Sequence, residues 1–96
     1  MVQEIVTYVP IVDGEEWAYY RSFKNAFFDI LGRQQKSNRC FVLERRSNLL
    51  QTTALTYEKI FALGESIGLS KDGKRNWGAA EPKEEVILVA FQGSST

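Results

Sequence analysis

The sequence predicts a single α+β domain in which two helices cover one face of a four-stranded antiparallel sheet. Three observations support this prediction. The 96 residues are 44% hydrophobic and 12% aromatic, which is typical of a small globular core. Two stretches repeat apolar residues at helical spacing. Four further stretches are rich in β-branched, aromatic or other apolar residues, as strands are. Together with the two helical stretches they give the order β-α-β-β-α-β.

Four segments are predicted as strands. Residues 3–9 are β-branched and aromatic and form the first. Residues 40–44 form the second, and a turn at residues 45–48 joins it to a weaker third strand at 49–54. The continuous apolar run at 85–91 predicts the last strand, central in the sheet and covered.

The first helix is predicted to begin next to residue 13. Asp13 and Glu16 have the spacing of a capping box, and Val12 and Trp17 stand in the positions of a hydrophobic staple. Gly32 should end the helix, or residues 33–36 should extend it by one turn. Its apolar face is Trp17, Tyr20, Phe23, Phe27, Ile30 and Leu31.

The second helix is predicted between Thr56, which can cap it, and Gly68, which should end it. Its apolar face is Tyr57, Ile60, Phe61, Gly64 and Ile67. Residues 70–82 then form one long loop, and loops of this length are often functional.

This order of elements indicates the ferredoxin-like plan. One domain should span residues 1–92, and residues 93–96 should form a frayed C-terminal tail. Because the chain direction alternates in this plan, the turn at 45–48 and the loop at 70–82 should share one end of the domain.

Charge is segregated along the chain although its total is zero. Twelve Lys and Arg balance twelve Asp and Glu, yet residues 1–16 hold acids without a base. Basic residues predominate in residues 33–46 and again in residues 71–75. Local fields of this kind select partners even where the net charge does not.

Basic residues at the 45–48 turn and in the 70–82 loop together predict a nucleic-acid contact. Arginine forks match phosphate oxygens, and an exposed tryptophan can stack on an unpaired base. The first functional hypothesis is therefore a small non-catalytic binding module for DNA or RNA, although a solvated charged turn would have the same composition. The predicted contact residues are Arg45, Arg46, Lys71, Lys74, Arg75 and Trp77.

A second hypothesis is a protein-interaction module, such as an adaptor, an inhibitor or a homodimer. Tyr19 and Phe28 point away from the centre of the first helix's apolar stripe. Exposed aromatic residues are enriched where proteins meet. A wide apolar face under the long loop explains the two residues equally well.

Catalysis by the common routes is disfavoured. The chain has no histidine, and Cys40 stands in a predicted apolar strand. Neither a zinc pattern nor a phosphate-binding glycine motif occurs, so no metal and no cofactor are predicted. The weakest hypothesis is a metal-dependent hydrolase, since helix starts and surfaces also collect acids. Its carboxylates would be Asp13, Glu15 and Glu16, or Glu81, Glu84 and Glu85.

The expected location is the cytoplasm. A single cysteine fits a reducing compartment, and the longest apolar run is too short to span a bilayer, so no membrane partner is predicted. A pI near 6.3 argues against a protein that coats nucleic acid extensively.

Overall fold

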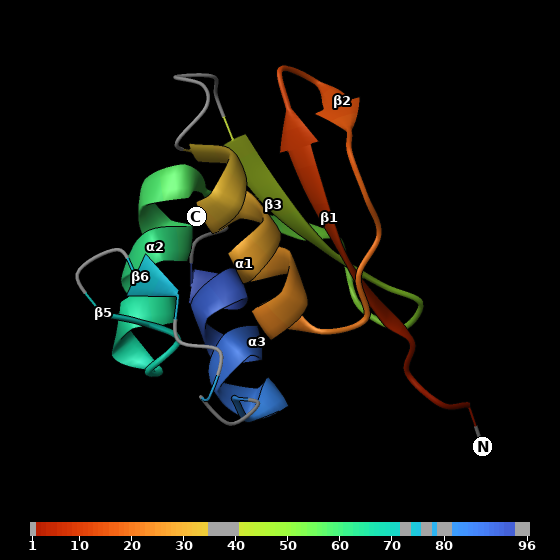
Figure 1. The fold of residues 1–96 in the computed structure, drawn as a ribbon. Helices are drawn as coiled ribbons and strands as arrows, with labels where there is room; N and C mark the ends of the chain where they lie inside the picture. The colour runs from red at the N-terminus through yellow and green to blue at the C-terminus, as the bar shows by residue number, and fades with distance from the viewer. Residues whose placement is uncertain (1, 35–40, 72–73, 76–77, 79–81, 94–96) are drawn as a thin grey trace.

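A computed structural model describes residues 2–34, 41–71, 74–75, 78 and 82–93 (Figure 1). These residues form a four-stranded sheet, a separate two-stranded ribbon and three helices. The elements are β1 (Val6–Val12), β2 (Glu15–Glu16), α1 (Phe23–Gln34), β3 (Phe41–Ser47), β4 (Thr53–Thr56), α2 (Tyr57–Ser66), β5 (Ser70–Lys71), β6 (Lys74–Arg75) and α3 (Glu84–Gly93).

The sheet has the order β2-β1-β3-β4, and each neighbouring pair is antiparallel. The central strands β1 and β3 pair from Val6 opposite Ser47 to Val12 opposite Phe41. The prediction of an α+β domain with a four-stranded antiparallel sheet is confirmed. Its fourth strand, however, is β2 and not the predicted segment 85–91.

The helices lie on one side of the sheet (Figure 1). Tyr8, Leu43 and Leu55 share a sheet face, because paired residues point to the same side and side chains alternate along a strand. Leu43 is paired with Leu55, and Tyr8 is paired with the residue two positions after Leu43. They join helix residues in one core cluster. Within it the rings of Tyr8, Phe23 and Phe91 lie 5.9 to 6.2 Å apart between centroids, so aromatic contacts connect β1, α1 and α3.

The predicted last strand at residues 85–91 is wrong, because these residues lie in α3. Periodicity cannot distinguish a covered strand from a helix when a short run is apolar throughout. The buried residues Ile87 and Phe91 are four positions apart, whereas Val86 and Val89 are exposed, which is a helical pattern. Within the described ranges, none of the helices has the length and hydropathy needed to cross a bilayer.

The predicted start of the first helix is also wrong, since α1 begins only at Phe23. Asp13 and Gly14 form the two-residue turn of the β1–β2 hairpin, and Val12 pairs with Glu15. The φ angles of Asp13 and Gly14 are +52° and +84°. Positive φ at both turn positions is the hairpin geometry that Asp-Gly favours, so the turn takes precedence over the capping box.

The segment after β2 extends along β1 instead of forming the first turns of a helix. The Trp17 N–H donates to the Pro10 carbonyl at 3.0 Å, and Tyr20 and Tyr8 exchange two backbone hydrogen bonds. Trp17 therefore has no staple role. It contacts α1 through Arg33, whose guanidinium carbon lies 3.9 Å from the centre of the indole.

The prediction of the second helix is confirmed. Thr56 takes the N-cap position of α2 but makes no capping hydrogen bond through its side chain, and Gly68 follows the helix with φ +82°, a conformation that favours glycine. Gly64 lies where α2 approaches α1. A Cβ atom at this position would lie 2.2 Å from Cε1 of Phe27, so only glycine permits this approach.

Candidate functional site

Arg45 and Arg46 lie in strand β3 and not in a hairpin turn, which corrects the sequence prediction. Successive side chains of a strand point to opposite faces. Arg45 therefore lies on the helix side with Leu43 and is 1% exposed, while the Arg46 side chain faces the outer side and is 36% exposed. The loop between β3 and β4 is formed by residues 48–52.

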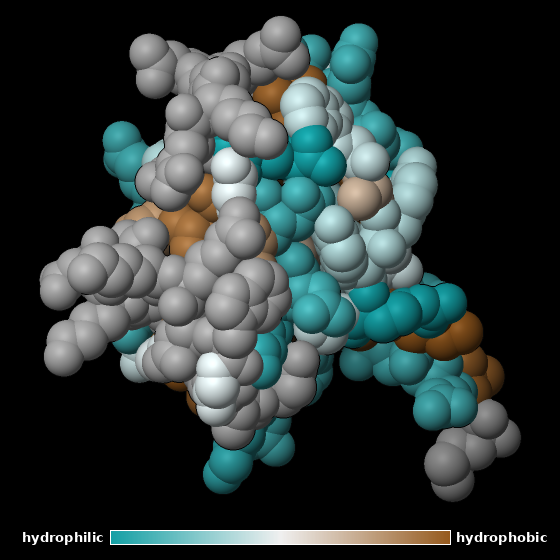
Figure 2. Space-filling view, in the orientation of Figure 1, coloured by the Kyte–Doolittle hydropathy of each residue, from teal (hydrophilic) through white to brown (hydrophobic). Residues whose placement is uncertain are grey.

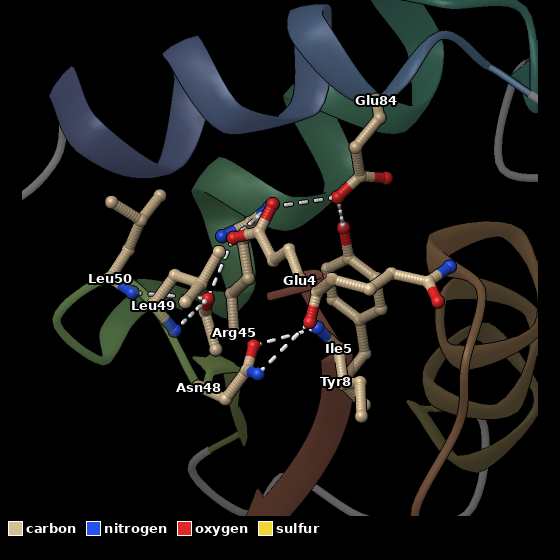
Figure 3. Close-up of polar contacts among 10 residues, drawn as sticks. Glu4, Ile5, Tyr8, Arg45, Asn48, Leu49, Leu50 and Glu84 are labelled. Atoms are coloured by element: carbon tan, nitrogen blue, oxygen red, sulfur yellow. Dashed lines mark hydrogen bonds and ion pairs between the residues drawn. The ribbon is translucent and has the colours of Figure 1, made fainter. Parts of the chain in front are cut away.

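The Arg45 guanidinium is held by acids from two other segments (Figure 3). Its Nη2 donates to Oε1 of Glu84, in the first turn of α3, at 2.9 Å, and lies 3.8 Å from Oε2 of Glu4. The Tyr8 hydroxyl donates to the same Glu84 oxygen at 2.8 Å. One carboxylate oxygen thus joins β1, β3 and α3.

These contacts shift the pKa values of Arg45 and Tyr8. Burial is the largest single influence on the pKa of Arg45 and lowers it, but the hydrogen bonds and charges of Glu84 and Tyr8 together outweigh burial, so the pKa is raised above its usual value. Burial and then the Glu84 carboxylate raise the pKa of Tyr8 well above its usual value. At neutral pH, Arg45 is a cation and Tyr8 an uncharged hydrogen-bond donor.

One donor of Arg45, its buried Nε–H, has no hydrogen-bond partner among the residues that the structure describes. A buried polar group without a partner costs about 1–3 kcal/mol, and such groups are rare in folded proteins. Because the Nε atom is closed to solvent, the missing hydrogen bond is a cost to the stability of the fold.

A pocket of about 240 Å³ reaches Arg45 between the β3–β4 hairpin and α3. It combines two apolar walls with amide and hydroxyl groups. Its volume lies below the range of about 300–1,000 Å³ typical of pockets that enclose a whole ligand. The pocket therefore suits a single side-chain-sized group better than a nucleotide. Its lining residues are Arg45, Leu50, Gln51, Thr53, Leu88 and Gln92.

The β3–β4 loop is fixed by Ser47 beside this pocket. The Ser47 hydroxyl donates to Oε2 of Glu4 at 2.6 Å and accepts the backbone N–H groups of Leu49 and Leu50, each at 3.1 Å. The same Glu4 oxygen lies near Arg45. The position of the loop and the surroundings of the arginine are thus coupled through one carboxylate.

Asn48 ties the N-terminal segment to the same loop (Figure 3). Its Oδ1 accepts the Ile5 N–H at 2.7 Å, and its Nδ2 donates to the Gln3 carbonyl at 3.1 Å. The two segments carry three exposed apolar side chains, which are called the apolar rim here: Ile5, Leu49 and Leu50. Figure 2 shows hydrophobic atoms along the N-terminal segment and also at other places on the same side.

Arg46 belongs to a separate group on the outer face. It donates to Oε1 of Glu44 from Nε at 2.8 Å and from Nη2 to Glu16, which also accepts the Tyr19 hydroxyl. The hydrogen bonds from Tyr19 and Arg46 lower the pKa of Glu16. Arg46 is thus paired with two acids, which weakens its expected role at a phosphate.

The two aromatic residues predicted for protein contacts have different positions. Tyr19 is 62% exposed, although it precedes α1. Phe28 is 3% exposed and packs against Phe27 with 5.7 Å between ring centroids, so its predicted exposure is wrong. The reason is that α1 packs on α2 as well as on the sheet, as the Phe27–Phe61 contact shows.

The other residues predicted to contact nucleic acid come from the β5–β6 ribbon and the residues after it in the sequence. Lys71 stands opposite Lys74 and Ser70 opposite Arg75 in its backbone register. Trp77 lies outside the described residues. The meeting of Lys71, Lys74, Arg75 and Trp77 with Arg46 stays a prediction.

The carboxylates of the hydrolase hypothesis are separated. Glu16 is bound to Arg46, whereas Glu84 is bound to Arg45 beneath α3. Glu81 and Cys40 lie outside the described residues. Among the residues placed by the structure, no group of three or more cysteines and acids is arranged to hold a metal ion.

Sequence reasoning missed the pocket, including Leu50, Leu88 and the burial of Arg45. One signal was available, because the alternation of Phe41, Leu43 and Arg45 continues the inner face of β3. No protein-family model, curated protein or solved structure matches this chain. The geometry of the Arg45 pocket is therefore the main evidence for function.

Proposed function

We propose that this chain is a non-catalytic protein-interaction module that docks a peptide segment of a partner protein at the Arg45 pocket. The observation that carries the proposal is the pocket of about 240 Å³ between the β3–β4 hairpin and α3, which is lined by Leu50 of the apolar rim. A peptide offers both groups that suit this site. Its amides supply hydrogen-bond acceptors, and its aliphatic side chains match Leu50 and Leu88.

The apolar rim sets the expected affinity. Ile5, Leu49 and Leu50 are 41% to 52% exposed, and covering them would stabilise a complex by about 3 kcal/mol, since full burial of such a side chain contributes about 1.5–3 kcal/mol. A micromolar complex requires about 8 kcal/mol. The rim supplies less than half of this, so we expect micromolar or weaker binding.

A random-peptide display selection on the wild-type protein tests the proposal. Peptides that are enriched should bind Leu50→Asp at least about 10-fold more weakly, a difference of about 1.4 kcal/mol. Val89→Asp is the matched control, because Val89 is an exposed apolar residue of α3 that does not line the pocket. A selection without enriched peptides, or peptides that bind Leu50→Asp unchanged, would contradict the proposal.

Nucleic-acid binding is a second candidate, favoured by the register of the β5–β6 ribbon. Lys71 and Lys74 stand at opposed positions, and like charges there destabilise a β-ladder. A bound phosphate backbone would offset this repulsion. Arg45 would take no part, because its charge is directed to Glu84.

Binding of labelled single- and double-stranded DNA and RNA at two salt concentrations tests this candidate. Affinity should fall as salt rises, and Lys71→Gln/Lys74→Gln should weaken it more than Arg46→Gln does. Absence of binding at low salt, or binding that the lysine substitutions do not change, would exclude it.

A further inference from the structure

The sheet ends in two edge strands with different surroundings. β4 leads directly into α2, and the pocket between the β3–β4 hairpin and α3 lies beside it. At the other edge, β2 is the outermost strand in the order β2-β1-β3-β4, and no described element lies beyond it (Figure 1). An open edge strand carries backbone groups that can pair with a strand of another molecule.

The backbone of Glu16 is directed toward this open edge. Glu15 pairs with Val12 across the hairpin turn. Two residues further on, the Trp17 N–H donates to the Pro10 carbonyl at 3.0 Å. Hydrogen bonding alternates between the two sides of a strand, so the N–H and C=O of Glu16, between these two residues, point away from β1. They are the donor and the acceptor that an added strand requires.

A β-bulge limits how far this edge can pair. Trp17 bonds to Pro10, and Tyr20 exchanges two backbone hydrogen bonds with Tyr8. The two residues between Trp17 and Tyr20 therefore stand opposite Val9 alone, which is the arrangement of a bulge. An added strand should pair before the bulge, so only a short segment of a partner is needed.

Two exposed aromatic side chains lie at this edge on opposite sides of the sheet. Trp17 is 37% exposed on the helix side, where Arg33 of α1 stacks on it. Tyr19 is exposed on the outer side, where its hydroxyl donates to Glu16. Tryptophan and tyrosine are enriched among the residues that dominate binding energy. Because polar partners already hold both side chains, a bound strand would order them at little entropic cost.

Charge distinguishes a second copy of this chain from a different partner. Glu15 has no ion-pair partner among the residues that the structure describes, whereas Glu16 is paired with Arg46. Two copies joined edge to edge would bring the acids of one copy close to those of the other. Like charges that oppose each other in a ladder destabilise it. A strand that carries Lys or Arg would be attracted instead.

We propose that the edge at residues 15–17 binds a short, extended and basic segment of a partner protein as an added β-strand. This interface is separate from the Arg45 pocket, so neither proposal depends on the other. Main-chain hydrogen bonds to Glu16 hold the segment, and its alternate side chains contact Trp17 on one side and Tyr19 on the other. A basic side chain meets an acid in either register, because Glu15 and Glu16 point to opposite sides.

A blocked peptide of alternating lysine and valine is the probe, and NMR of the full chain at low salt is the readout. The ¹H–¹⁵N signals of the Glu16 backbone and the Trp17 indole should shift in a saturable manner, and hydrogen exchange at the Glu16 N–H should slow. The same peptide with glutamate in place of lysine should bind at least about 10-fold more weakly. Absence of these changes at Glu16, or equal binding of the two peptides, would overturn the proposal.

Glu16→Pro removes the N–H that the added strand needs. Proline is tolerated on edge strands, so the variant should fold. Glu16→Ala is the matched control, because it removes the same carboxylate and keeps the N–H. The lysine peptide should bind Glu16→Pro at least about 5-fold more weakly than Glu16→Ala, which is the factor for one hydrogen bond. Equal binding would contradict strand addition, and hydrogen exchange in the wild-type protein decides the question however the proline variant folds.

Sedimentation of the free protein tests the alternative occupant. The protein should be a monomer, because the acids of β2 oppose pairing with a second copy. A dimer that Glu16→Pro dissociates would show that a second copy of the chain occupies this edge, and it would overturn the proposed basic partner.

Discussion

Two arginines that follow one another in β3 meet opposite surroundings. Arg45 is buried beneath α3, where Glu84 accepts its hydrogen bond, and Arg46 lies on the outer face between Glu44 and Glu16. The residues are of one type and adjacent, so the difference comes from the face to which each points.

The comparison teaches that an ion pair has no fixed energetic value. Exposed pairs contribute little, because water solvates both partners when the pair is broken. A buried pair contributes little on formation but is costly to break, since one partner stays without compensation. Two neighbouring basic residues in a sequence are therefore not one functional site.

The largest effect is expected for Arg45→Ala. It removes a buried side chain and leaves the Tyr8–Glu84 pair without its cation, so we expect a loss of about 3 kcal/mol in the free energy of unfolding, the low end for broken buried pairs because Glu84 is half exposed. Urea denaturation measures this. Arg46→Ala is the control and should lose much less. Equal losses would show that the two faces do not differ.

The next effect is expected for Gly64→Ala, which alters the packing on the helix side of the sheet. Its Cβ would lie 2.2 Å from the Phe27 ring, which is buried and cannot move away without disturbing the core. Overpacking of this kind costs about 2 kcal/mol. Thermal and urea unfolding measure the change. A variant as stable as wild type would contradict the close contact between α1 and α2.

A smaller effect is expected for Gly14→Ala in the exposed β1–β2 turn. There is space for the methyl group, but φ of +84° disfavours any residue with a Cβ. The expected loss is about 1 kcal/mol, measured by urea unfolding. A loss larger than that of Gly64→Ala would reverse the expected order of the two sides of the sheet.

The smallest effect on stability is expected for Tyr19→Phe. This substitution tests the outer face through the pH dependence of Glu16, which accepts the Tyr19 hydroxyl. The pKa of Glu16 is lowered in the folded protein, first by Tyr19 and then by Arg46. The contribution of Glu16 to the free energy of unfolding is therefore fully present above its pKa in the unfolded chain, about 4.3. It is lost as the pH falls through its lower pKa in the folded protein.

Titration of the Glu16 side-chain carboxyl by ¹³C NMR measures this effect. Tyr19→Phe should raise the pKa of Glu16 toward its usual value. Tyr20→Phe is the control, because the Tyr20 hydroxyl donates to Asp29 and should not affect Glu16. An unchanged pKa of Glu16 in Tyr19→Phe would show that the Tyr19 hydroxyl does not stabilise the Glu16 carboxylate.

The sequence predicts those elements whose pattern has one interpretation. The helical spacing before Gly68 predicts α2, and a branched and aromatic segment predicts β3 with an error of a few residues. The run at 85–91 has two interpretations, because every face of it is apolar. The segment at Asp13 and Gly14 also has two interpretations, a hairpin turn or the capping box of a helix. The structure has the hairpin turn, which Asp-Gly favours.

The site was less predictable than the fold. The burial of Arg45 follows from strand alternation once β3 is extended past Glu44, a step that a run of charged residues discourages. Its contact with Glu84 could not be predicted while residues 85–91 were taken as a strand. The pocket depends on where α3 lies, which is tertiary information.

The hydrogen bond between Tyr8 and Glu84 joins residues 76 positions apart, and this has a consequence for synthesis on the ribosome. The strands of the sheet are complete once β4 has been made, but Tyr8 and Phe23 lack the Phe91 ring until α3 emerges. At about 5–20 residues per second, this interval lasts on the order of seconds. During that time the nascent chain presents an open aromatic surface, so α3 closes the domain only after the strands of the sheet have been made.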